Sequence, residues 1–177
     1  MTNTKFTAGD AFPEITLPKV GGGELTLGQP LNGNDWQMVV VYRGKHCPLC
    51  TKYLTQLEQL KERFFENGID IVAVSADGET KASAHVSDMG LSFPVAYDLS
   101  IEQMQALGLY ISHPKSPQET DKPFAEPGIY VINDKGQVQV TDISNAPFAR
   151  PELEPLAWGL GFIRDPENDY PIRGTFG

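Results

Sequence analysis

The stretch MVVVYRGKHCPLCTKYLTQLEQLKERFFENGIDIVAVS, residues 38–75, decides the fold. It opens with a continuous apolar and β-branched run at 38–42, which is typical of a strand buried on both faces. Apolar residues then recur at three- and four-residue steps and predict an amphipathic helix over 48–66, followed by an Asn-Gly stop. A second apolar run at 69–75 predicts another buried strand. Strand, helix and strand in this order predict a right-handed crossover between parallel strands.

The remaining predicted elements are shorter and surround this unit. Alternating runs on both sides of a Gly-Gly-Gly turn predict a small β-hairpin over 15–27, at the edge of the domain. Residues 110–127 contain four prolines and are predicted to form an irregular loop. The other expected elements are helices at 79–90, 100–109 (with Ser100 as N-cap) and 151–162, a strand at 93–98, and an antiparallel hairpin of 128–133 with 137–143. The expected fold class is α/β.

Length and charge limit the possible functions. At 177 residues the chain suits one domain, which we expect to span 1–177, with a core at about 8–162 and a tail at 163–177. Asp and Glu outnumber Lys and Arg by 23 to 14, and the basic residues do not cluster. Binding to nucleic acid or to an anionic membrane is therefore not expected.

The N-terminal sequence MTNTKFTAGD is polar and contains no apolar signal core. No segment approaches the ~18 consecutive apolar residues of a membrane helix. We therefore expect a cytoplasmic protein, in a compartment that keeps thiols reduced. The sequence has no nucleotide, flavin or haem motif, so no cofactor is expected.

Both cysteines of the chain lie in the unit Cys-Pro-Leu-Cys at the predicted start of the long helix. Unpaired backbone N–H groups and the helix dipole favour thiolate at such a position, and Pro48 suits the first helical residue. Lys45 and His46 are expected to add positive charge nearby. We interpret Cys47 as the nucleophile and Cys50, one turn further, as the thiol that resolves its oxidised form.

Two other interpretations of the cysteine pair, a structural metal site and simple core filling, fit the sequence less well. A structural zinc site needs two further ligands, and the chain offers only its three histidines, His46, His85 and His113. His46 adjoins Cys47, which makes joint ligation awkward, so no metal site is expected. Two cysteines that merely fill space would not explain the proline and the helix-start position. The spacing and the strand–helix context favour redox chemistry.

Three stretches resemble the AhpC/TSA (redoxin, peroxiredoxin-like) family of the thioredoxin-like superfamily. They are GDAFPEITLPKVGGGELTLGQ (9–29), YRGKHCPLCTKYLTQL (42–57) and EPGIYVINDKGQV (126–138). The resemblance covers about residues 8–160 and implies a thioredoxin-like fold, with a mixed central sheet and an N-terminal hairpin extension. It also implies a thiol-dependent oxidoreductase that reduces hydroperoxides or protein disulfides. An electron donor of the thioredoxin or glutathione type and a homodimer are further implications.

The family motifs carry over only in part. The hairpin match makes Pro127 the counterpart of the superfamily's cis-proline, which helps to dock substrates. Peroxiredoxins place Pro and Thr seven and three residues before the reactive cysteine, but this chain has Val40 and Gly44 there. The family's peroxide-polarising arginine would stand where Pro127 is found.

Two arginines and a glutamate are candidates to fill these gaps. Arg43 lies four residues before Cys47 and is expected to pair with its thiolate, and Arg150 aligns with a second peroxiredoxin arginine and is the weaker candidate. A surface ion pair is the common alternative for either. Thioredoxins also bury an Asp where Val41 stands here. Glu126 is a candidate for that role, although a solvated loop carboxylate is the simpler interpretation.

The sequence leaves three functions open. The first is reduction of a peroxide or of a disulfide through the cysteine pair. The second is a copper-binding or copper-delivery module on the same fold, whose cysteine spacing would be one residue longer than here. The third is a non-catalytic interaction protein.

Overall fold

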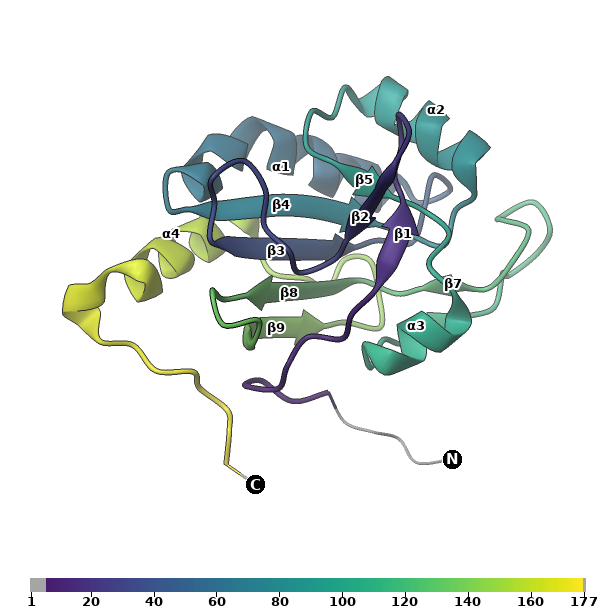
Figure 1. Cartoon of the computed structure of the whole chain (residues 1–177). Coiled ribbons are helices and arrows are strands. Elements are labelled where there is room, and N and C mark those ends of the chain that lie inside the picture. Colours follow the sequence, from purple (N-terminus) through teal and green to yellow (C-terminus); the bar gives the residue numbers. More distant parts are fainter. Residues whose placement is uncertain (1–5, 177) are drawn as a thin grey trace.

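A five-stranded mixed sheet forms the centre of the computed structural model, which describes residues 6–176 (Figure 1). The strand order is β5-β4-β3-β8-β9, with β3 parallel to β4 and antiparallel to β8. The strands are β3 (Trp36–Val41), β4 (Ile69–Val74), β5 (Val95–Ala96), β8 (Gly128–Ile132) and β9 (Val138–Ile143). The α/β class, the parallel β3–β4 crossover and the C-terminal hairpin are confirmed.

The crossover helix α1 (Pro48–Phe65) begins and ends within one residue of its predicted bounds. Its buried side chains are spaced by three, four and seven residues, so they lie on one face and pack against the sheet; they are Cys50, Leu54, Leu57 and Phe64. All six residues of β3 are buried, as expected for a central strand covered on both faces. The N-terminal end of α1, which contains Cys50, is therefore packed into the hydrophobic core.

Two apolar clusters cover the two faces of the sheet. Helices α1 and α4 (Leu153–Arg164) pack on one face, and α2 (Glu79–Met89) adds Val86 and Met89 beside them. The other face is covered by α3 (Ile101–Ala106) and by the hairpin of β1 (Thr16–Pro18) and β2 (Glu24–Thr26). In Figure 1 this hairpin crosses in front of the sheet and α1 lies behind it.

The segment at 110–127 is more ordered than its composition predicted. It contains a two-stranded antiparallel ladder of β6 (Ile111–Ser112) with β7 (Phe124–Ala125). Strands of two residues carry too little side-chain alternation to be recognised in a sequence. The prediction of Ser100 as a helix N-cap is confirmed, since its hydroxyl accepts the Gln103 N–H in a capping box.

Helix α4 extends to Arg164, into the predicted tail, and the described residues after it, 165–176, contain one short 3-10 helix at Pro166–Asn168 and no other helix or strand. Within residues 6–176, none of the helices has both the length and the apolar character that crossing a bilayer requires.

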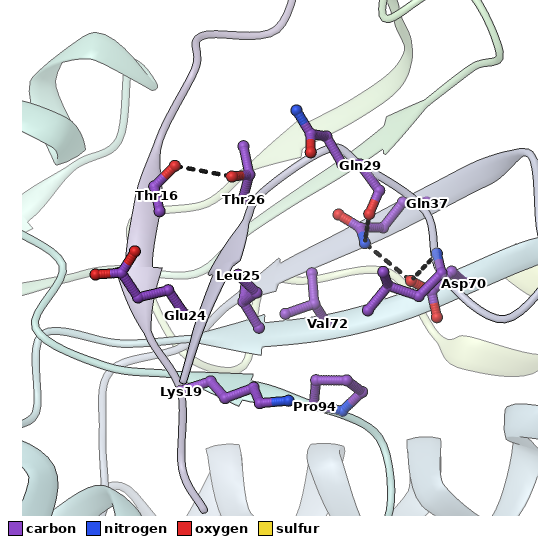
Figure 2. Close-up of a pocket in the computed structure, with 11 residues that line it drawn as sticks. Thr16, Lys19, Glu24, Leu25, Thr26, Gln29, Gln37, Asp70, Val72 and Pro94 are labelled. Atoms are coloured by element: carbon purple, nitrogen blue, oxygen red, sulfur yellow. Dashed lines mark hydrogen bonds between the residues drawn. The ribbon is translucent and has the colours of Figure 1, made fainter. Parts of the chain in front are cut away.

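A polar cluster ties the loop after β2 to the amino-terminal ends of β3 and β4, far from the cysteine end of these strands. Figure 2 shows the Gln37 side chain between Gln29 and Asp70. Its amide nitrogen donates to Asp70 Oδ2 (2.9 Å) and to the Gln29 carbonyl (3.1 Å), while the Leu31 N–H donates to the same Asp70 oxygen (3.1 Å). Because Gln37 and Asp70 are buried, these bonds satisfy groups that would otherwise oppose folding.

We expect Asp70→Ala to destabilise the protein, because the buried Gln37 amide and the Leu31 N–H lose their acceptor. The free energy of unfolding should fall by about 1–3 kcal/mol in a urea titration followed by circular dichroism. Glu24→Ala is the control, because it removes an exposed carboxylate beside the same cavity and should cost less than about 0.5 kcal/mol. Equal losses in the two variants would contradict a structural role for Asp70.

Candidate active site

Cys47 is the N-cap residue of α1, so its side chain meets the first free N–H groups of the helix. Its sulfur accepts the Cys50 backbone N–H at 3.3 Å, and Pro48 follows at the start of the helix, where a missing N–H costs nothing. Both cysteines are free thiols and both are buried, with Cys47 only 3% and Cys50 0% exposed. The structure thus brings the two sulfurs of the motif together in a reduced state.

The surroundings of the two thiols drive their pKa values apart. The pKa of Cys47 is lowered to about 6, first by a hydrogen bond from the Cys50 thiol and also by the charges of Arg150 and Arg43, with burial acting in the opposite direction. The pKa of Cys50 is raised by the same hydrogen bond and by burial. Cys47 is therefore the group that holds the negative charge, and Cys50 is its proton donor.

Of the two residues predicted to add positive charge near Cys47, His46 does not do so, because burial favours its neutral form, and Lys45 extends into solvent. The Lys45 side chain is exposed, and the contact that fixes this residue is its backbone N–H to Asp77 Oδ2 at 2.8 Å. The His46 ring packs edge-on against Phe124, and burial lowers its pKa, which favours the neutral imidazole. The charges that lower the pKa of Cys47 most belong to Arg150 and Arg43.

Arg150 lies directly on the cysteine pair. Its Nη2 donates to Cys50 Sγ at 3.2 Å, its Nε donates to the Pro147 carbonyl at 2.8 Å, and its guanidinium stacks over the Tyr53 ring at 4.5 Å. The sequence makes Arg150 a weaker candidate than Arg43 for the cysteine site. In the structure, however, Arg150 is the arginine whose side chain donates a hydrogen bond to a cysteine sulfur. Arg150 lies in the loop before α4, 100 positions after Cys50 in the chain, and the fold of this loop places it beside Cys50.

Arg43 and Glu126 form a buried ion pair. The guanidinium donates from Nε to both carboxylate oxygens (3.0 and 2.8 Å) and from Nη2 to Oε1 (2.6 Å), and the Ser112 hydroxyl also donates to Oε1 (2.9 Å). Glu126 is 1% exposed, so its interpretation as a solvated loop carboxylate is wrong. Its contacts are with Arg43 and Ser112 rather than with Cys50.

Gly44 has a positive φ of 139°, and the Asp77 carboxylate occupies the space beside it. A Cβ placed on Gly44 would lie 2.6 Å from Asp77 Oδ1, closer than any side chain tolerates. A side chain at this position, where peroxiredoxins have Thr, therefore requires the Asp77 carboxylate to move. Asp77 follows β4 and is buried, and nothing in the sequence pattern singled it out.

The peptide bond before Pro127 is trans, since none of the bonds within residues 6–176 is cis. The cis prediction for Pro127 is therefore wrong. The backbone on both sides is held extended between β7 and β8, because the Glu126 N–H donates to the Tyr110 carbonyl (2.8 Å) and the Pro127 carbonyl accepts the Ser144 N–H (3.0 Å).

The histidines are not gathered at the cysteines as metal ligands. His85, on α2, is buried and its Nε2 lies 2.8 Å from Thr51 Oγ1, in the first turns of α1. His113 is exposed in the 110–127 segment. Within the described residues, 6–176, no three His, Cys, Asp or Glu side chains form a group that could hold a metal ion.

An open groove of about 500 Å³ runs beside the cysteine pair, between α1 and the loop that carries Arg150. Leu49, Tyr53, Pro147 and Phe148 form its apolar walls. Phe148 is 79% exposed, and Leu49, which stands between the two cysteines in the chain, is 45% exposed. Arg150, which contacts Cys50, also lines this groove.

Comparison with known proteins agrees with this geometry. The family model described as Redoxin matches residues 7–154. The chain belongs to the Redoxin family. It is a thiol-dependent redox enzyme with a thioredoxin-like fold, as the sequence predicted.

Two curated relatives align with somewhat more than half of this Redoxin family member. A Mycobacterium tuberculosis protein named as a peroxiredoxin, Rv2521, is 29% identical over 107 residues, which is 60% of this chain and 67% of the relative. The thiol-disulfide oxidoreductase ResA of Halalkalibacterium halodurans is 33% identical over 103 residues, 58% of this chain and 57% of ResA. The chain thus aligns with less than two thirds of ResA.

Solved structures show the same fold at low sequence identity. A mutant of peroxiredoxin 6 from Arenicola marina superposes with a TM-score of 0.76 at 17% identity, covering 90% of this chain and 74% of that one. Peroxidoxin BcpB from Mycobacterium tuberculosis gives a TM-score of 0.71 at 18% identity, covering 89% and 97%. These likenesses confirm the mixed sheet with flanking helices.

Gly44→Ala should destabilise the loop before Cys47, because the new Cβ meets the Asp77 carboxylate and also requires a positive φ. We expect a loss of about 1–3 kcal/mol or more in the free energy of unfolding, measured by urea titration. Gly22→Ala is the matched control: its φ is also positive, at 105°, but no atom lies within 4 Å of its Cβ position. A loss no larger than that of the control would show that Asp77 moves aside freely.

The alkylation of Cys47 by iodoacetamide should titrate with a midpoint near a pH of about 6. Cys50→Ala should move this midpoint upward, because the hydrogen bond that lowers the pKa most is lost. Thr16→Ala, which removes a hydroxyl bound only to Thr26, is the control. An unchanged midpoint in Cys50→Ala would mean that the arginines and the helix start dominate.

Proposed function

We propose that this enzyme reduces hydroperoxides with Cys47 as the attacking thiolate and Cys50 as the resolving thiol. The observation that carries the proposal is the opposite shift of their two pKa values within one hydrogen-bonded pair. At neutral pH such a pair offers a nucleophile and a proton donor side by side. The burial of both sulfurs favours a small oxidant over a bulky one.

In the first step the Cys47 thiolate attacks the O–O bond of the hydroperoxide. The sulfur gains one oxygen and becomes sulfenic acid, and the remaining fragment takes a proton and leaves as an alcohol, or as water when the substrate is hydrogen peroxide. In the second step the Cys50 sulfur attacks the sulfenic sulfur, which forms the disulfide and releases water. Two equivalents of an external thiol then reduce the disulfide and become oxidised in turn.

Arg150 is the candidate to stabilise charge during both steps. Its Nη2 already contacts Cys50 Sγ, so it favours the thiolate that Cys50 must become in the resolving step. Its Nη1 is buried and has no hydrogen-bond partner among the described residues, which leaves one donor for a peroxide or sulfenate oxygen. Pre-positioned donors of this kind stabilise developing negative charge.

Reduction of protein disulfides by the same pair is the second candidate. The Cys-Pro-Leu-Cys spacing and the relative named as a thiol-disulfide oxidoreductase favour it. The exposed apolar walls of the groove beside Cys50 would suit a peptide chain. In this version Cys47 forms a mixed disulfide with the partner, and Cys50 then releases the reduced partner.

Other assignments follow from the proposed cycle. We infer an external thiol donor of the thioredoxin or glutathione type, a cytoplasmic setting that keeps the pair reduced, and no bound cofactor. A homodimer is proposed on the exposed aromatic side chains of α4, Trp158 and Phe162. Pro127 is proposed as a support of the substrate site through its place between Glu126 and β8.

Stopped-flow mixing of the reduced enzyme with hydrogen peroxide tests the proposal. Wild type should react much faster than free cysteine, and Cys47→Ser should lose this reaction entirely. Cys50→Ser should still react once, but it should accumulate sulfenic acid, which dimedone labels and mass spectrometry detects.

The same three proteins are then assayed with the disulfides of insulin. If wild type reacts with peroxide no faster than free cysteine but reduces insulin, the second candidate replaces the first. If Cys47→Ser retains either activity, the assignment of the nucleophile is wrong.

A further inference from the structure

The Arg43–Glu126 ion pair joins two parts of the chain that meet only in the folded protein. Arg43 follows β3 and precedes the cysteine motif, whereas Glu126 lies 83 positions later, between β7 and β8. The Glu126 side chain is 2% exposed and the Arg43 side chain 22%, so the carboxylate is the inner partner. Glu126 is thus the partner that anchors the ion pair in the protein interior.

Glu126 is itself rigidly held. Its carboxylate accepts the Ser112 hydroxyl, and its backbone N–H donates to the Tyr110 carbonyl at 2.8 Å. These two partners flank Ile111, where β6 begins its pairing with β7. The short ladder at 110–127 therefore fixes the direction in which the carboxylate points.

The charge of Arg43 acts on the reaction centre. It lowers the pKa of Cys47, and the negative charges of both cysteines in turn raise the pKa of Arg43. Its effect on the pKa of Cys47 adds to the larger effects of the Cys50 hydrogen bond and of Arg150. Arg43 acts from the loop between β3 and α1. Pro127, which stands where the family has its peroxide-polarising arginine, carries no charge.

The guanidinium depends on Glu126 to stay where it is. Burial works against its charged form, and the hydrogen bonds to Glu126 are the largest opposing influence. Within residues 6–176, its other described contact is with the Phe124 ring, 5.1 Å from the guanidinium carbon. A guanidinium without a buried carboxylate gains more from water than from one aromatic face.

We propose that Glu126 is a positioning residue, which holds the Arg43 guanidinium at the corner before the cysteine motif, where its charge favours the Cys47 thiolate. The proposal deepens the peroxidase function proposed above and rests on it for its biological meaning. Its physical content, the ionisation of Cys47, is independent of any oxidising substrate.

The two possible roles of Glu126 predict opposite signs. If Glu126 were only a nearby anion, its removal would relieve repulsion and make Cys47 more acidic. If it holds the arginine, its removal lets the guanidinium swing into solvent, and Cys47 becomes less acidic. Because several hydrogen bonds would be broken at once, the loss of position should outweigh the loss of one negative charge.

The test is the pH dependence of Cys47 alkylation by iodoacetamide in Glu126→Gln, followed by mass spectrometry. We expect the midpoint to rise by about 0.3–0.5 pH unit, which lowers the thiolate fraction at pH 6 about 1.5- to 2-fold, because Arg43 is a smaller influence on Cys47 than the Cys50 hydrogen bond and Arg150. Glu119→Gln is the matched control, because it removes one negative charge from the same segment without touching Arg43. The control should leave the midpoint where it is in wild type.

Arg43→Gln and the double variant Arg43→Gln/Glu126→Gln complete the cycle. If Glu126 acts through Arg43, both should show the same rise as Glu126→Gln alone, so the two effects do not add. A fall in the midpoint of Glu126→Gln, no change, or an additive rise in the double variant would overturn the proposal.

Folding and activity are separated by two further measurements. Circular dichroism identifies a variant that has unfolded. If Glu126→Gln is unfolded, Glu126→Asp, which keeps the charge on a shorter side chain, is measured in its place. We expect a smaller rise of the midpoint in Glu126→Asp, and no rise would contradict the proposal. Peroxide reduction is measured alongside. A wild-type protein that alkylates as expected but ignores peroxide would refute the proposed function while leaving the role of Glu126 intact.

Discussion

The hydrogen bonding between the two cysteines at the start of α1 is the constraint around which the site is built. The helix has to begin at Pro48, so that Cys47 caps it and Cys50 returns to the same point one turn later. That requirement fixes where β3 ends and how α1 packs against the sheet. The hydrogen bond between the two thiols then favours the negative charge on Cys47, and the nearby arginines add to this effect.

Local patterns explain how much of this could be predicted from the sequence. The apolar period of α1, the buried runs of β3 and β4 and the cap at Ser100 are all encoded within a few residues, so their positions followed directly. The chemistry of the cysteine motif was readable for the same reason. The β6–β7 ladder was not, because its strands are too short to show a period.

Contacts between distant segments account for the rest of the site. Arg43 meets Glu126 across 83 positions and Arg150 meets Cys50 across 100, and no local signal in a single sequence reports either pairing. The family resemblance named Arg43, Arg150 and Glu126 as candidates, but it did not report which of them pair with each other. Proximity along the chain is a poor guide at a strand-to-helix corner, because side chains there fan out in different directions.

The close approach of Asp77 to Gly44 has a consequence for how such a site could change over evolutionary time. A Thr at position 44, the residue found in peroxiredoxins, has no room while the carboxylate remains, and a smaller residue at 77 would first remove the acceptor of the Lys45 N–H. Neither single replacement is neutral. The two positions are therefore coupled, and a Thr at position 44 is compatible with this loop only if position 77 changes with it.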